Sequence, residues 1–200
     1  ALALLGKRVE NEYIGLNSGI MDQFSIAMGK KDHAILLNTE NLDYSYAPFH
    51  LGNNVLVVGF TNKKRSLADS KYNERFSECR AALKIIQQTK DIEHLVELTL
   101  DELESYKVLL SDVLYRRVKH VVSEQALKVN DIDTLSALLI EGHRSLQYDY
   151  EVSGIELDTL VDAFIAQGAL GARQTGAGFG GCMIAIIDKD KLSTAIKQVE

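Results

Sequence analysis

Apolar and polar positions recur along this 200-residue chain with the spacing of helices over most of its length. Apolar residues three or four positions apart form one face of a helix. The first 28 residues fit two helices separated by an irregular loop, with Asp22 opening the second helix. The same pattern predicts further helices at 68–88, 92–98, 112–127, 131–146 and 156–167, and a last helix after residues 188–190.

Three short apolar runs interrupt this helical pattern and predict strands. The runs at 34–37 and 55–60 are bounded by turns rich in Asn, Asp and Gly, and the run at 182–187 follows a glycine-rich stretch. Helices are therefore inserted between strands instead of alternating strictly with them. This order favours an α+β fold over a doubly wound parallel sheet.

Composition and charge narrow the class of protein. The chain is 46% hydrophobic and 25% charged, which is typical of a globular chain of one or two domains that needs no metal or disulfide to form a core. Cys79 and Cys182 lack metal-binding spacing and favour a reduced, cytoplasmic setting. A formal charge of −6 argues against nucleic acid or an anionic membrane as partner, and no apolar run approaches the roughly 18 residues of a membrane span.

Both ends of the chain are helical in pattern, without a start or stop signal. We therefore expect the 200 residues to be part of a longer protein.

The glycine-rich stretch contains Gly176, Gly178, Gly180 and Gly181 and satisfies the pattern G-x-G-x-x-G. A dinucleotide site needs a strand before these glycines and a helix after them, whereas here a helix ending near Gly168 is expected before the loop and a strand after it. Two interpretations remain open. The loop can bring backbone N–H groups close to an anion or a sugar, or it can simply turn the chain tightly into a sheet.

Two carboxylates flank the irregular loop near the start of the chain. Asp22 follows the loop at the start of a helix, where an aspartate is either a helix N-cap or a catalytic base. Glu10 ends the preceding helix, a position at which a solvated surface glutamate is the common explanation. Two carboxylates beside one loop can also divide the work, one holding Mg²⁺ and the other accepting a proton.

Other polar residues point less clearly to chemistry. The basic run at 63–65 follows a predicted strand and suits either a phosphate contact or, more commonly, a solvated loop. The five histidines show no spacing typical of a zinc site.

Four segments, spread over nearly the whole chain, carry the motifs of a family resemblance. They are Glu10-Asn11-Glu12-Tyr13-Ile14-Gly15 with Gly19-Ile20-Met21-Asp22-Gln23-Phe24, residues 62–75 around Tyr72, residues 143–158 around Asp149-Tyr150-Glu151-Val152-Ser153, and residues 171–182 with the glycine-rich loop. In this order they resemble segments of the galactokinases, and the last is similar to the third signature of the wider GHMP kinase superfamily.

The resemblance implies a role for each candidate residue. Asp22 takes the place of the catalytic base, which accepts the proton of the anomeric hydroxyl of galactose as that oxygen attacks the γ-phosphoryl group of ATP. Glu10 takes the place of the Mg²⁺ ligand, and Tyr72 and Gly19 those of substrate-binding residues. The loop from Gly176 to Gly181 is expected to shape the pocket without holding the nucleotide itself.

The resemblance also implies a fold and a domain organisation. Residues 31–200 are expected to form the two-layer, ferredoxin-like C-terminal domain of the GHMP kinase fold, with extra helices and incomplete at its C-terminus. Residues 1–30 are expected to be the end of the N-terminal domain, carrying the catalytic aspartate. The family's early Gly-Glu-His segment and its Pro-x-x-x-Gly-Leu-Ser-Ser-Ser phosphate loop have no match here, so the partner of this chain is expected to be the missing N-terminal half of the same protein.

The function implied for the whole protein is ATP-dependent phosphorylation of galactose to galactose 1-phosphate in Leloir metabolism, while the chain alone is expected to be inactive. Two alternatives stay open: a galactokinase-like regulatory protein that senses galactose, and a kinase for N-acetylgalactosamine. A purely structural α+β module would leave four ordered motifs as coincidence.

Overall fold

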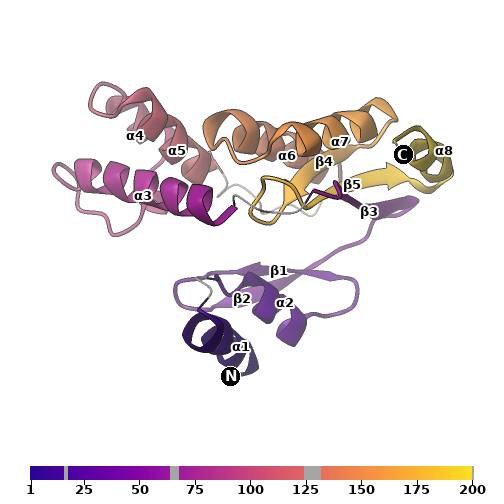
Figure 1. Ribbon diagram of the computed structural model, residues 1–200, viewed down its shortest axis with the longest axis horizontal. Helices are drawn as coiled ribbons and strands as arrows, with labels where there is room; N and C mark the ends of the chain where they lie inside the picture. The colour runs from indigo at the N-terminus through magenta and orange to yellow at the C-terminus, as the bar shows by residue number, and fades with distance from the viewer. Residues whose placement is uncertain (16–17, 64–67, 124–131, 200) are drawn as a thin grey trace. The chain divides into compact units, whose positions relative to one another are not determined.

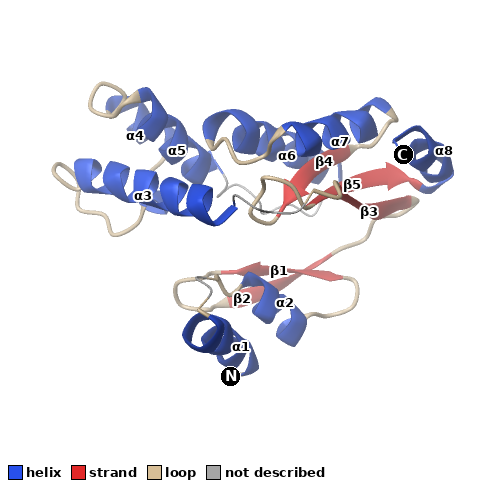
Figure 2. Cartoon of the chain, viewed as in Figure 1, coloured by secondary structure: helices blue, strands red, loops and turns tan. Residues whose placement is uncertain are grey.

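The computed structural model describes residues 1–15, 18–63, 68–123 and 132–199, with the backbone alone at 68–70 and 72. The chain divides into two compact units, Ala1–Gly52 and Asn53–Glu200. Strands are confined to two small sheets, and helices make up most of the remaining chain (Figure 2). Within the described ranges, no helix combines the length and the apolar character that crossing a bilayer requires.

The first unit is a small helical pair packed on a hairpin. Its elements are α1 (Leu2–Arg8), the π-helix η1 (Val9–Ile14), α2 (Met21–Met28), β1 (His33–Leu37) and β2 (Tyr44–Pro48). β1 and β2 pair antiparallel. Phe24 of α2 is buried with Ala3 and Ile20, and Ile35 and Leu37 of β1 pack against the same cluster.

Because of this packing, the boundary between the two compact units lies beyond residue 30, where the sequence analysis expects the N-terminal domain to end. The hairpin shares its apolar contacts with α1 and α2, and the ring of Tyr44 meets that of Phe24 edge-on at 5.2 Å between centroids. The first unit therefore extends to Gly52. That the two units correspond to two kinase domains remains a prediction.

The second unit contains a three-stranded sheet of β3 (Asn54–Phe60), β4 (Gly171–Thr175) and β5 (Cys182–Asp188) in the order β3-β5-β4. β5 pairs antiparallel with both neighbours, so β3 and β4 run in the same direction with β5 between them. Together with α8 (Lys189–Val199), this is a split β-α-β followed by a strand and a helix, the pattern of a ferredoxin-like fold. The α+β prediction is confirmed.

Helices cover this sheet and its edge (Figure 1). Leu157, Val161 and Phe164 of α7 (Ile155–Ala166) are buried against Met183 and Ile187 of β5, in a core that α8 also joins. The preceding helix, α6 (Ile132–Arg144), lies against the edge strand β4. The backbones approach so closely that a Cβ on Gly171 would lie 2.5 Å from the carbonyl oxygen of Ser136.

A second core in the same unit is entirely helical. Its elements are α3 (Ala68–Ile86), the 3₁₀ turn η2 (Leu95–Glu97), α4 (Leu100–Ser105) and α5 (Asp112–Ser123). Ile86, Leu103 and Val118 are fully buried there. A further π-helix, η4 (Ser145–Asp149), continues directly from α6 and contacts α5. The segment around η4 thus lies where the helical core approaches the layer of helices and strands.

The structure corrects the predicted elements in a few places. Residues 92–98 form only the short turn η2 instead of a helix. β2, β4 and α4 were not predicted. β4 reads Gly-Ala-Arg-Gln-Thr, which lacks the apolar alternation that identifies a strand. The end predicted for the helix at 112–127, and the start predicted at 131, lie outside the described residues.

Candidate active site

Asp22 lies exposed in the first turn of α2, at the end of the loop that precedes this helix. The N-cap residue of α2 is Ile20, and no side chain caps the helix. The N-cap interpretation of Asp22 is therefore wrong. Near a helix N-terminus a negative charge is stabilised by the free backbone N–H groups. Among the described residues no partner binds its carboxylate, which leaves it available to a ligand.

Asn11 holds the loop that leads to Asp22. Its side-chain oxygen accepts hydrogen bonds from the backbone N–H and the hydroxyl of Ser18, at 3.0 and 2.9 Å, and its amide donates to the Ser18 carbonyl at 3.3 Å. Gly15 ends η1 in the left-handed region, at φ 79°. Residues 16 and 17 lie outside the described part. The sequence analysis gave Asn11 no role in the site. Its place in the first motif segment, between Glu10 and the loop, was the signal that could have identified it.

Glu10 lies in η1, half-buried on the same side of this loop. The polar side chains of Ser18 and then Gln23, close to its carboxylate, hold the pKa of Glu10 below its usual range. The side-chain oxygen of Gln23, the neighbour of Asp22 in α2, is buried without a hydrogen-bond partner. Glu10 therefore lies near Gln23, the residue that follows Asp22, and an unpaired oxygen of Gln23 lies beside the Glu10 carboxylate.

Gly19, the other predicted residue of this segment, is exposed, and a Cβ there would meet nothing within 4 Å. Among the residues that the structure describes, none requires glycine at this position. Its predicted contact with substrate remains a prediction.

The glycine-rich loop joins two strands of the sheet. β4 ends at Thr175 and β5 begins at Cys182, and these two residues pair across the hairpin. A strand, not the expected helix, precedes the loop. Because a strand also follows it, the strand-loop-helix arrangement of a dinucleotide site is still not met.

The loop has a tightly constrained backbone. Gly176, Gly178, Gly180 and Gly181 all have φ between 78° and 116°, and Phe179 has φ 57°. The N–H of Phe179 donates to the carbonyl of Val152 at 2.8 Å. A Cβ on Gly178 would lie 1.9 Å from that same carbonyl oxygen, so glycine is required there by both conformation and space.

Thr61, directly before the second motif segment, holds the end of this loop, and an ion pair joins that segment to the third. Thr61 donates its backbone N–H and its hydroxyl to the carbonyl of Gly181, at 2.9 and 3.0 Å. The Lys63 ammonium lies 2.6 Å from the Glu156 carboxylate. Three of the four motif segments therefore converge within the second unit.

The remaining predicted site residue and the basic run are only partly described. Tyr72 lies in α3, but its side chain is outside the described part of the structure. Within the run at 63–65, Lys63 is paired with Glu156, while the other two residues lie outside the described part.

His143 and Gln174 lie behind the loop and are buried, a placement that the sequence did not reveal. The backbone N–H of Gln174 donates a hydrogen bond to Nδ1 of His143 at 3.3 Å. This bond uses a backbone donor on the outer edge of β4. Nε2 of His143 lies 3.3 Å from a carboxylate oxygen of Asp158, although the pair lacks the alignment of a hydrogen bond. Burial lowers the pKa of His143, and the charge of Asp158 opposes this only in part.

Stability should therefore fall as the pH decreases through the range in which unfolded histidine takes up a proton. The unfolded state binds this proton near pH 6.5, while folded His143 binds it only at lower pH, so stability is present above about 6.5 and is lost below it, by at most about 1.4 kcal/mol for each pH unit. Urea unfolding of the full-length protein between pH 5 and 7.5 measures this slope. His143→Gln should flatten it, whereas the same change at exposed His50 should not; equal slopes in all three proteins would contradict the assignment.

Comparison with known proteins shows which proteins this chain resembles. Residues 123–200 match the family model of the GHMP kinases C terminal domain. The chain is 53% identical over 201 aligned residues to a galactokinase of Lactiplantibacillus plantarum and 50% identical over 208 to one of Enterococcus faecalis. These alignments cover 96% and 99% of the chain but 52% and 54% of the relatives, so the chain spans about half the length of the curated relatives it matches.

Solved structures show the same similarity. A Lactococcus lactis galactokinase, determined in complex with galactose, superimposes with a TM-score of 0.90 at 43% identity, over 98% of this chain and 53% of that one. A mevalonate kinase shares the fold at a TM-score of 0.57 and 21% identity. Residues 123–200 are therefore similar to the C-terminal domain of the GHMP kinases, and the chain as a whole is similar to about half of a galactokinase.

Proposed function

We propose that the full-length protein carrying this sequence is a galactokinase, which transfers the γ-phosphoryl group of ATP to the anomeric hydroxyl of α-D-galactose. The products are galactose 1-phosphate and ADP. The observation that carries this proposal is the 53% identity to a galactokinase along 96% of the chain. The superposition on a galactokinase that was solved with galactose supports the same substrate.

In this proposal Asp22 serves the attacking hydroxyl. Phosphoryl transfer depends mainly on positioning and on stabilising charge. An aspartate is a weak base at neutral pH, so its contribution combines proton acceptance with orientation of the hydroxyl. Its exposed position on a helix whose preceding loop is braced by Asn11 suits this task.

Glu10 is proposed to hold Mg²⁺. The residues present fit this ion, because Mg²⁺ prefers oxygen ligands and the Glu10 carboxylate lies beside Ser18 and the unpaired buried oxygen of Gln23. When bound, the ion neutralises charge on the phosphates of ATP. The lowered pKa of Glu10 keeps its carboxylate ionised for this role.

Sugar contacts are proposed for Tyr72 and Gly19, and the loop from Gly176 to Gly181 is proposed to shape the pocket. Support for the loop comes from the Phe179–Val152 hydrogen bond and from the Thr61 contacts, which fix it. A reduced, cytoplasmic setting is part of the proposal, since Cys79 and Cys182 are both free thiols.

Sugar-dependent release of ADP tests the proposal. We expect the full-length protein, with ATP and Mg²⁺, to release ADP when galactose is added, and more slowly with N-acetylgalactosamine. The 200-residue chain alone should release none. Faster turnover of N-acetylgalactosamine would identify the alternative kinase, and galactose binding without turnover would identify the sensor; either result contradicts the proposal.

A further inference from the structure

The segment from Asp149 to Val152, between η4 and α7, has a backbone that needs external support. Glu151 has φ 56°, in the left-handed region that a side chain with a Cβ rarely adopts. Such a conformation persists only where surrounding groups hold it. The question is which groups hold this segment, because Val152 is the residue that accepts the hydrogen bond of the glycine-rich loop.

Two buried arginines from two different helices bind the carbonyl groups of this segment. Arg117 of α5 donates to the carbonyl of Asp149 at 2.6 Å. Arg75 of α3 donates to the carbonyls of Tyr150 and Glu151, at 2.7 and 3.3 Å. Three successive carbonyls are therefore bound by guanidinium groups, which present several donors in a fixed plane.

Carboxylates fix the two arginines in place. Arg117 is 1% exposed and donates to Glu78 of α3 at 2.7 Å and to the carboxylate of Glu151 at 2.5 Å. Arg75 is 6% exposed and shares Glu78, at 3.1 Å. A hydrogen bond from Arg117 is the main reason that the pKa of Glu151 lies below its usual range. The cluster is thus an ionised network that joins both helices to the segment.

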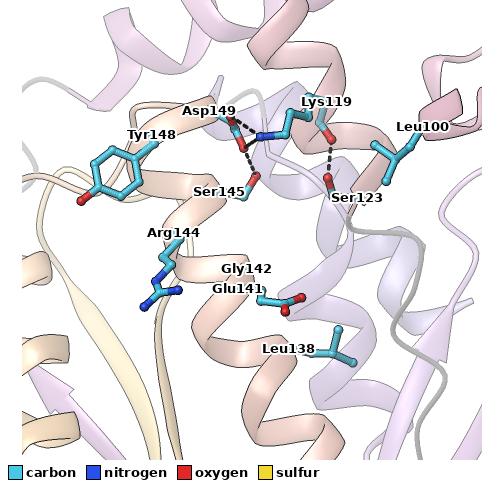
Figure 3. A pocket seen from close by; sticks show the side chains of 10 residues that line it. All are labelled: Leu100, Lys119, Ser123, Leu138, Glu141, Gly142, Arg144, Ser145, Tyr148 and Asp149. Carbon is cyan, nitrogen blue, oxygen red and sulfur yellow. Dashed lines mark hydrogen bonds and ion pairs between the residues drawn. The ribbon is translucent and has the colours of Figure 1, made fainter. Parts of the chain in front are cut away.

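Apolar packing cannot replace these bonds on the outer side of η4. A cavity of about 510 Å³ opens there between α5, α6 and η4 (Figure 3). Figure 3 shows Lys119 and Ser145 converging on the Asp149 carboxylate at its rim, with Lys119 at 3.1 Å and Ser145 at 3.0 Å. Polar bonds hold the segment on this side as well.

The held segment leads directly to the glycine-rich loop. The N–H of Val152 donates to the carbonyl of Leu146 at 3.0 Å, and its own carbonyl accepts from Phe179 at 2.8 Å. Gly178 lies against that same carbonyl. A change in the peptide at Glu151 would rotate the Val152 carbonyl away from both loop residues.

We propose that Arg75 and Arg117 are positioning residues for the glycine-rich loop: they hold Tyr150 and Glu151 in the one backbone conformation from which Val152 can accept the Phe179 hydrogen bond. They act through this backbone and touch no substrate. Their effect on the reaction rests on the proposed function, in which the loop shapes the pocket.

Amide hydrogen exchange of the full-length protein tests this proposal independently of activity. Arg117→Lys keeps the charge but cannot span Glu78, Asp149 and Glu151 together. We expect the amide exchange rate in the peptide containing residues 176–181 to rise about tenfold, which corresponds to the loss of one hydrogen bond to a charged group. The exchange rate in α7 should stay unchanged. Arg80→Lys is the matched control, since Arg80 is exposed on α3 and contacts the ring of Phe76.

Steady-state kinetics with galactose then distinguish the positioning role of the two arginines from the proposed function of the whole protein. A fall of about tenfold in kcat/KM for galactose, together with faster loop exchange, supports both. Faster loop exchange with unchanged kinetics supports the positioning role and contradicts the loop's part in catalysis. Unchanged loop exchange, or exchange that rises equally in the loop and in α7, overturns the proposal. Arg75→Lys gives the same test should Arg117→Lys fail to fold, because within the described ranges it alters bonds to the Tyr150 and Glu151 carbonyls and to Glu74 and Glu78.

Discussion

Replacement of Asp22 by alanine in the full-length protein should lower galactose-dependent release of ADP by about 10²–10⁴-fold, the usual contribution of a positioned general base. The free energy of unfolding should change by less than about 1 kcal/mol, because the side chain is exposed and does not cap α2, and only its interaction with the helix N-terminus is lost. The loss should appear in kcat, since the proposed base acts on the hydroxyl as the new bond forms. Steady-state kinetics and urea unfolding of the same preparation measure both effects.

Asp190→Ala is the matched control for this experiment. Asp190 is also an exposed aspartate in the first turn of a helix, α8, so the two changes remove the same charge from similar positions. We expect Asp190→Ala to leave kcat within about twofold of the unmodified protein, as surface substitutions usually do. Equal activity of the Asp22→Ala and unmodified proteins would show that Asp22 is not the base.

Helices with a regular apolar face could be predicted from the sequence because their burial is local and periodic. In α5, Val118 and Val122 are four positions apart, and both enter the helical core. The strand β5 was equally clear, since its apolar run is buried on both faces. The motif residues of the glycine-rich loop and of the Asp22 segment could also be predicted from the sequence. Few other residue types can replace a glycine at positive φ or a carboxylate that accepts a proton.

The supporting residues could not be predicted, because their environment is made by distant parts of the chain. Arg116 and Arg117 are adjacent in sequence, yet their side chains are 25% and 2% exposed. Glu151 pairs with both arginines, whereas Glu78, 39 residues away, pairs with Arg117 and not with Arg116. The strand β4 was missed for a similar reason: Gln174, a polar residue, is 1% exposed because α6 and the loop cover it.

Gly178→Ala should be the most destabilising single change in the glycine-rich loop. The new Cβ would lie 1.9 Å from the carbonyl oxygen of Val152. That oxygen belongs to the backbone of a segment held by Arg75 and Arg117, so it cannot swing aside as the end of a flexible side chain can. We expect a loss of about 3 kcal/mol or more in the free energy of unfolding, from overpacking added to the strain of positive φ.

Gly52→Ala separates the cost of overpacking from the cost of backbone strain at positive φ. Gly52 also has a positive φ, of 57°, but a Cβ there would meet nothing within 4 Å. Its replacement should cost only the conformational strain, about 1 kcal/mol. Urea unfolding of both variants of the full-length protein gives the difference, which measures the close approach of Gly178 to Val152. If the two substitutions cost the same, that approach does not exist in the protein, and the path from the arginines to the loop through Val152 fails with it.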